Sequence, residues 1–125
     1  MQGLHLTADL TLCQCDADWL TDAARLGSAC LQAVQAAGLQ GVAQLFHTFP
    51  ATVHGPGGVT ATVLLAESHL CVHTWPEQRG VTLDVYVCNF GGDHSAKAHA
   101  LLDALLALFQ PQSAVRNALH RGQHT

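Results

Sequence analysis

Apolar and polar residues alternate in several short segments of the chain, which is the pattern of half-buried β-strands. This alternation predicts strands over residues 3–12, 41–49, 59–65, 69–74 and 81–88. A stretch rich in glycine and proline predicts a loop over 50–58. After Pro111 the pattern is weaker, and we expect only a short edge strand over 114–119.

Two longer segments carry apolar residues at every third or fourth position, which is typical of amphipathic helices. We predict one helix over 16–37, with Asp16 or Asp18 as its N-cap and Gly38 as its stop, and a second helix over 93–109. Strands with short connections and two helices favour an α+β fold, a two-layer sandwich of a mainly antiparallel sheet with both helices on one face. Because the other face is then uncovered, we expect a dimer.

Length and composition exclude several classes of protein. The 125 residues fit one domain, and 49% hydrophobic against 11% charged residues predict a folded core. Five Lys and Arg stand against nine Asp and Glu, for a net charge of -4, and no basic run is present to bind nucleic acid. The apolar stretches are too short for a membrane span and the first residues lack the basic region of a signal peptide, so we expect a cytoplasmic protein without membrane contact.

The cysteines and histidines show no recognised metal-binding pattern. No CxxC spacing occurs among the five cysteines, which favours reduced thiols over disulfides. The spacings Cys13-x-Cys15 and His69-x3-His73 are not those of known zinc sites. We therefore predict no metal site.

Residues 66–77 and 84–88 place a serine, two histidines, acidic residues and two cysteines on neighbouring predicted strands. One hypothesis is a hydrolase in which Ser68 and His73 form a nucleophile pair oriented by Asp84, although the chain has no GxSxG elbow. The alternative is that these residues have no catalytic function and serve only in a turn or in the packing of the core. In an extended strand Ser68 and His73 point to opposite faces, so a functional pair requires a bend or bulge at Ser68.

The segment ESHLCVHTWPE at 67–77, followed by DVYVC at 84–88, resembles the signature of the small prokaryotic S-adenosylmethionine decarboxylases. Residues 3–6, 46–49 and 58–60 extend this resemblance over most of the chain. The resemblance implies a single decarboxylase domain.

The family resemblance also implies a proenzyme that cuts its own chain between Glu67 and Ser68, giving fragments 1–67 and 68–125 and a pyruvoyl cofactor derived from Ser68. The Ser68 hydroxyl attacks the preceding carbonyl, the resulting ester eliminates to dehydroalanine, and hydrolysis then releases ammonia. The pyruvoyl ketone condenses with the amino group of the substrate and accepts the electrons released as carbon dioxide leaves. The implied small-molecule substrate is S-adenosylmethionine, and the product is the aminopropyl donor for spermidine synthesis.

Further roles follow from the same resemblance, residue by residue. Cys88 matches the catalytic proton donor of the family, and His73 matches the histidine that assists processing. Thr60 stands where the family more often has a serine that supports the acyl shift. Phe49 matches an aromatic residue that stacks on adenine, and Glu77 matches an acid at the substrate site. In the family the active sites lie where two protomers meet, which implies a homodimer here.

Three departures from the family pattern lie near the expected substrate pocket. Asn89 follows Cys88 where glycine is usual, Thr48 follows His47 where arginine is frequent, and the loop over 51–57 is longer. These changes keep open a pyruvoyl-dependent arginine or ornithine decarboxylase on the same scaffold.

An arginine or ornithine decarboxylase needs a buried acid to hold the cationic side chain of its substrate, and Asp84 or Asp93 could supply it. A second alternative is an unprocessed regulatory homologue without catalytic activity. The joint presence of Ser68, His73 and Cys88 argues against that homologue, because a non-catalytic protein has no need of all three.

Overall fold

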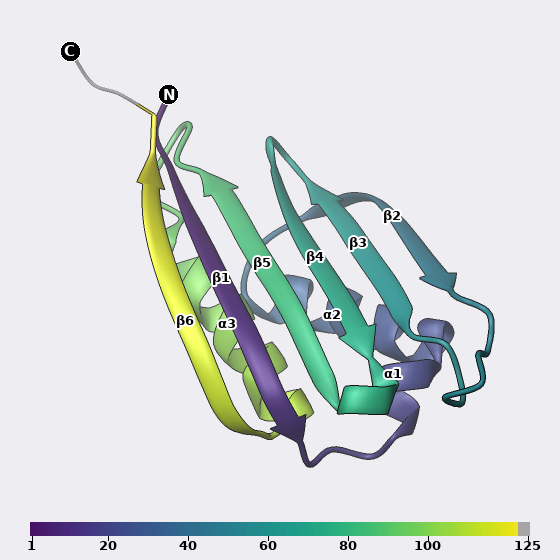
Figure 1. Cartoon of the computed structure of the whole chain (residues 1–125). Helices are drawn as coiled ribbons and strands as arrows, with labels where there is room; N and C mark the ends of the chain where they lie inside the picture. The colour runs from purple at the N-terminus through teal and green to yellow at the C-terminus, as the bar shows by residue number, and fades with distance from the viewer. Residues whose placement is uncertain (123–125) are drawn as a thin grey trace.

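The computed structural model describes residues 1–122, which form two layers (Figure 1). One layer is a six-stranded antiparallel sheet in the order β2-β3-β4-β5-β1-β6. Its strands are β1 (Gly3–Cys13), β2 (Gly41–Thr48), β3 (Val59–Leu65), β4 (Ser68–Trp75), β5 (Gly80–Cys88) and β6 (Pro111–Arg121). The other layer contains α1 (Asp18–Thr21), α2 (Ala23–Ala36) and α3 (Ser95–Phe109), and a short 3-10 turn, η1 (Pro76–Gln78), joins β4 to β5. The predicted α+β sandwich is confirmed.

Pleating sorts the side chains of the sheet onto a helix-covered face and an open face. On the covered face, α3 packs on β1 and β5, and α2 packs on β2 and β3 (Figure 1). The largest buried side chains include Leu6, Leu70, Leu101, Leu105 and Phe109. Burial of each such side chain stabilises the fold by about 1.5–3 kcal/mol. The open face carries histidines, threonines and acids, and no helix of the described chain covers it.

Thr74 is the one polar side chain that is fully buried within residues 1–122. Its hydroxyl accepts a hydrogen bond of 2.8 Å from the Val59 N–H and donates one of 2.7 Å to the Leu20 carbonyl. One hydroxyl therefore links β3, β4 and α1, and satisfies two backbone groups that the core would otherwise leave unpaired.

The first predicted helix is wrong in one respect, because the chain forms two helices there, so that three helices pack on the sheet. Asp22 has an extended backbone that ends α1, and its side chain accepts a hydrogen bond of 3.1 Å from the Arg25 N–H. Asp22, and neither Asp16 nor Asp18, is therefore the N-cap of the long helix. Gly38 ends that helix as predicted, in a left-handed conformation with φ of 83°.

The edge strand β6 is longer than the predicted 114–119. It pairs with β1 from Pro111, opposite Cys13, to Arg121, opposite Gly3. Most of its side chains are exposed, so the sequence carries no strong alternation to mark where the strand begins and ends. No helix within the described chain is long and apolar enough to cross a membrane.

Candidate active site

A two-residue turn, Ala66 and Glu67, connects β3 to β4, so that Leu65 pairs with Ser68. Glu67 has a φ of 55°, in the left-handed region, which costs a residue with a side chain about 1–2 kcal/mol. The backbone N–H of Cys88, the last residue of β5, donates a hydrogen bond of 2.9 Å to Ser68 Oγ. Glu67, Ser68 and Cys88 are therefore held together at one end of the sheet, which we name the serine end.

A cavity of about 290 Å³ opens at the serine end. Glu67, Ser68 and Cys88 line it, together with His94 and Lys97 from the start of α3. Cys88 is only 9% exposed and is one of the residues that line the cavity. The residues that line the cavity thus include a serine, a cysteine and the two residues of the Glu67–Ser68 peptide bond, which carry the groups that nucleophilic attack and proton transfer would use.

The opposite end of β4 carries the remaining predicted site residues. His73 pairs with Thr60 on β3, and Thr60 Oγ1 lies 2.9 Å from His73 Nδ1 in a hydrogen bond. These two residues line a second cavity, of about 460 Å³, with Phe49, Trp75 and Glu77. Phe49 is about half exposed, and its ring makes an edge contact with the His47 ring at a centroid distance of 4.7 Å. We name this group the histidine end.

Within one chain, Ser68 and His73 do not meet. The pairing of β4 with β3 is continuous from Ser68 to His73, so the bend or bulge that a direct pair requires is absent from this strand. At about 3.3 Å per residue, the five residue steps between them correspond to roughly 17 Å. Within one chain, the direct pair of Ser68 and His73 that the hydrolase hypothesis requires is therefore not formed.

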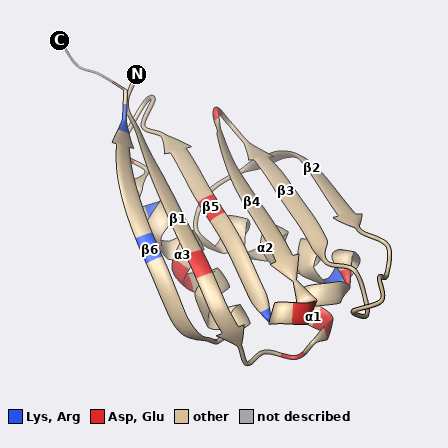
Figure 2. Cartoon of the chain, viewed as in Figure 1, with Lys and Arg blue, Asp and Glu red and all other residues tan. Residues whose placement is uncertain are grey.

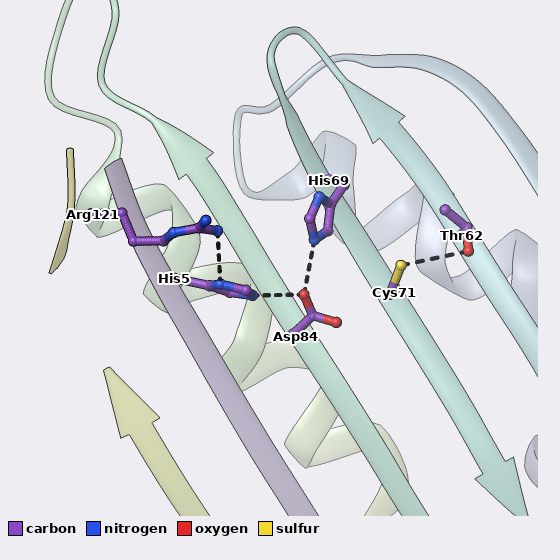
Figure 3. Close-up of polar contacts among 6 residues, drawn as sticks. All are labelled: His5, Thr62, His69, Cys71, Asp84 and Arg121. Atoms are coloured by element: carbon purple, nitrogen blue, oxygen red, sulfur yellow. Dashed lines mark hydrogen bonds and ion pairs between the residues drawn. The ribbon is translucent and has the colours of Figure 1, made fainter. Parts of the chain in front are cut away.

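Asp84 on β5 is hydrogen-bonded to two histidines on neighbouring strands (Figure 3). Its Oδ2 lies 2.8 Å from Nε2 of His5 on β1 and 2.8 Å from Nε2 of His69 on β4. Arg121 Nη1 lies 3.4 Å from His5 Nδ1 and can only donate, so Nδ1 accepts and Nε2 carries the proton given to Asp84. Asp84 therefore does not orient His73, as the hydrolase hypothesis required.

The cluster of His5, His69 and Asp84 has the spacing of a metal site, since its three ligating atoms lie within 4.8 Å of one another. An imidazole nitrogen binds a metal only through its unprotonated lone pair. Both Nε2 atoms instead donate to the carboxylate in this network. We therefore interpret the cluster as a hydrogen-bonded brace across β1, β5 and β4.

Neither Asp84 nor Asp93 offers the buried, unpaired acid that an arginine or ornithine side chain would need. Asp84 is shared by two imidazoles. Asp93 is exposed, and the Ser95 N–H donates a hydrogen bond of 2.9 Å to its carboxylate, which lowers the pKa of Asp93. The geometry gives the arginine or ornithine alternative no support.

All five cysteines are free thiols. Burial raises the pKa of Cys13 to about 11 and that of Cys30 to about 12, so both thiols stay protonated and unreactive at neutral pH. The carbonyls of Cys13 and Cys15 both accept hydrogen bonds from the Arg79 guanidinium, which makes that segment a structural contact. Cys88 is the cysteine that lines the serine-end cavity.

Comparison with known proteins assigns the family. The sequence model of the S-adenosylmethionine decarboxylase family matches residues 4–122. The chain belongs to this family. The S-adenosylmethionine decarboxylase proenzyme of Aquifex aeolicus is 36% identical over 120 residues, which are 96% of this chain and 81% of that protein. The proenzyme of Thermococcus onnurineus is 30% identical over 123 residues, 98% of this chain and 82% of that protein.

The fold agrees with that assignment. The crystal structure of the adenosylmethionine decarboxylase from Aquifex aeolicus matches this structure with a TM-score of 0.84 and 32% sequence identity. The match covers 98% of this chain and 92% of the other. Both the sheet and its helical layer are therefore shared with an S-adenosylmethionine decarboxylase.

Asn89, where the family resemblance led us to expect glycine, makes two side-chain contacts in this chain. Its Oδ1 accepts a hydrogen bond of 2.8 Å from the His94 N–H, and its Nδ2 lies 3.4 Å from Ser95 Oγ. The side chain thus fastens the loop after β5 to the start of α3.

Three residues near these groups were not among the predicted site residues: His5, His94 and Lys97. The signals for His5 were its place on the polar face of an alternating strand and in the segment 3–6 that shares the family resemblance. His94 and Lys97 follow a glycine-rich loop, and only the folded chain brings them to the serine end.

Proposed function

We propose that this protein is a self-processing S-adenosylmethionine decarboxylase whose pyruvoyl cofactor forms from Ser68. The observation that carries the proposal is the serine end, where Ser68 follows a residue with a left-handed backbone and accepts a hydrogen bond from the Cys88 N–H. Relatives of the chain are S-adenosylmethionine decarboxylase proenzymes, a name that implies processing in those proteins.

Processing would begin when Ser68 Oγ attacks the carbonyl carbon of Glu67. The peptide C–N bond breaks, an ester forms, and the amino group of Ser68 is set free. Removal of the Ser68 Cα proton then breaks the Cβ–Oγ bond and expels Glu67 as a carboxylate, and hydrolysis of the remaining dehydroalanine releases ammonia. The strained φ of Glu67 favours the first step, because breaking the peptide bond relaxes the turn.

The pyruvoyl group supplies an electron sink for the loss of carbon dioxide. Cys88 lines the same cavity as Ser68 and is the group we assign to return a proton to the α-carbon of the substrate. At the histidine end, Phe49 offers an aromatic face to the adenine and to the sulfonium, and Glu77 offers a carboxylate. The product would be the aminopropyl donor for spermidine synthesis.

We propose further that a second copy of the chain completes each active site. One strand keeps Ser68 and His73 at opposite ends of the sheet, so a single protomer holds two halves of a site. A two-fold dimer formed through the open faces would bring the serine end of one protomer to the histidine end of the other. His73 and its hydrogen-bonded Thr60 would then support processing in the partner subunit.

The open face has the apolar content that such an interface needs. Leu45, Leu64, Val115 and Leu119 point to this face and are 72%, 49%, 59% and 60% exposed. Large apolar side chains mixed with polar groups are typical of homodimer surfaces.

Denaturing intact-mass measurement of the purified protein tests the proposal before any substrate is added. We expect fragments 1–67 and 68–125, the second lighter by one ammonia than a fragment that begins with serine. Ser68→Ala should give one uncut chain without activity, whereas Ser28→Ala, at an exposed position of α2, should process normally. An uncut wild-type chain, or decarboxylation by Ser68→Ala, would contradict the proposal.

A further inference from the structure

Lysine and arginine residues are few and scattered over the chain (Figure 2). Among the Lys and Arg residues of the described chain, Lys97 is the one without a hydrogen bond or ion pair. The four arginines all have partners: Arg25 pairs with Asp16 and Asp18, Arg79 with the carbonyls of Cys13 and Cys15, Arg116 with Asp103, and Arg121 with His5. Lys97 makes no hydrogen bond or ion pair within residues 1–122, although its half-buried stem lies against Gly38 and its side chain lines the serine-end cavity. An unpaired ammonium group beside a cavity favours an anion as its partner.

His94 has a second unpaired group at the same cavity. Its Nδ1 is the one buried side-chain nitrogen or oxygen of residues 1–122 that has no hydrogen-bond partner. The backbone of His94 is anchored beside the cavity, because its N–H donates a hydrogen bond of 2.8 Å to Asn89 Oδ1. Buried polar atoms are nearly always paired in proteins. Because His94 is one of the residues that line the cavity, a group that enters the cavity can supply the missing partner.

We propose that Lys97 and His94 form a receptor for the α-carboxylate that Glu67 acquires when the chain cuts itself. This inference rests on the self-processing proposed above. Glu67 lines the same cavity as the two residues, and the cut would create its new carboxylate at that point of the chain. The receptor is therefore complementary to a product of processing that the uncut chain does not yet contain.

The receptor would act on one bond-breaking step. In the ester formed by Ser68, a base removes the Cα proton, the electron pair forms the Cα–Cβ double bond, and the Cβ–Oγ bond breaks. Oγ departs with the Glu67 acyl group as a carboxylate, which carries the negative charge. The Lys97 ammonium and a hydrogen bond donated by His94 Nδ1 would stabilise that charge as it develops, and so speed the elimination. The N-terminal end of α3 adds a small positive potential.

The α-carboxylate of the substrate is a second carboxylate that could bind to Lys97 and His94. The carboxylate of an α-amino acid loses its charge as carbon dioxide leaves, so a cation held against it stabilises the ground state more than the transition state. Such a contact would slow decarboxylation, whereas the same contact with a leaving carboxylate speeds processing. The leaving group of processing is therefore the better occupant.

The test follows self-cleavage in a cell-free translation reaction, sampled over time by denaturing intact mass with and without hydroxylamine. Lys97→Met keeps the stem that packs on Gly38 and removes the charge, and His94→Phe keeps a ring and removes Nδ1. Both variants should form the pyruvoyl fragment at least about tenfold more slowly than wild type. Hydroxylamine should cleave the accumulated ester, leaving Glu67 as a hydroxamate and a 68–125 fragment that begins with serine.

Two control variants distinguish loss of the proposed carboxylate receptor from a general effect of lost charge or lost folding. Lys97→Arg should restore processing to near the wild-type rate, and Arg116→Met, which removes a paired surface charge, should leave it unchanged. Wild-type kinetics in Lys97→Met, with no trapped ester, would overturn the inference. So would normal processing of that variant with a raised KM for S-adenosylmethionine, which would assign the site to the substrate. A wild-type chain that is never cut would instead refute the proposed function.

Discussion

Ser68 and His73 share one uninterrupted strand, and that strand keeps them apart, at opposite ends of the sheet. The two residues also have different hydrogen-bond partners. Ser68 Oγ accepts a hydrogen bond from the Cys88 N–H, and His73 Nδ1 is paired with Thr60 Oγ1. If both residues serve one active site, the chain needs a second copy of itself. The first prediction tests this requirement.

Mixing two inactive variants should restore activity if each site draws on two protomers. Cys88→Ala damages the serine end and His73→Ala the histidine end, so a mixed dimer contains one doubly damaged site and one intact site. Co-expression in equal amounts should therefore recover about a quarter of the wild-type activity, measured as carbon dioxide release from S-adenosylmethionine. Co-expression of Cys88→Ala with Ser68→Ala, both at the serine end, should recover none. If neither mixture recovered activity, the active site would not be built from two protomers in this way.

Replacement of Cys88 by serine should affect turnover far more than processing. The proposed role of Cys88 is proton donation during decarboxylation, and a positioned acid typically contributes about 10²–10⁴-fold to the rate. We expect normal fragments by intact mass and a fall in kcat within that range. Cys71→Ser, on the open face beside Thr62, serves as the matched control. Nearly wild-type turnover of Cys88→Ser would remove this thiol from the mechanism.

Thr74→Val should destabilise the fold although it changes the shape of the side chain very little. The variant leaves the Val59 N–H and the Leu20 carbonyl without the buried hydroxyl that now pairs with both. The free energy of unfolding should fall by about 1–3 kcal/mol, measured by urea denaturation of the uncut Ser68→Ala background. Thr11→Val, at an exposed hydroxyl, should change it by less than about 0.5 kcal/mol.

Cys30 should make the protein less stable in alkaline solution. Burial raises its pKa to about 12 from a usual value of 9.0, so the unfolded chain releases this proton at lower pH than the folded chain. The stability that the protonated thiol contributes is complete below about pH 9 and is lost as the pH rises toward 12. Between pH 8 and pH 10, Cys30→Ala should lose about 1 kcal/mol less unfolding free energy than wild type.

The control for Cys30 is Val34→Ala, a second buried position of α2 that carries no thiol. This variant should be less stable at both pH values but should keep the full alkaline loss. An identical pH dependence in Cys30→Ala and wild type would show that the thiol is not the titrating group.

Local sequence was enough to place most strands, because alternation and burial have the same period in a sheet with one covered face. It was not enough at Asp22, where a capping side chain splits a stretch whose apolar spacing suits one long helix. Nor was it enough for β6, whose exposed side chains leave backbone pairing with β1 as the main determinant of its length.

Some residues of the candidate site could likewise be predicted from the sequence, and others could not. Ser68, His73 and Cys88 could be predicted from a sequence motif, because all three lie in two nearby segments, 67–77 and 84–88. The contact of His5 with Asp84 depends on strand order, which places β1 beside β5 although 79 residues separate the two side chains. Lys97 carries no motif at all, and only the absence of a partner in the folded chain distinguishes it.

The strand order also decides what happens to the two halves of a cut chain. Fragment 1–67 would contain β1, β2 and β3, and fragment 68–125 would contain β4, β5 and β6. Because β1 lies between β5 and β6, and β3 lies beside β4, the two fragments are interlocked through three separate ladders of backbone hydrogen bonds. Cleavage would remove one covalent link and leave all three ladders in place, so neither fragment could depart without unfolding the sheet.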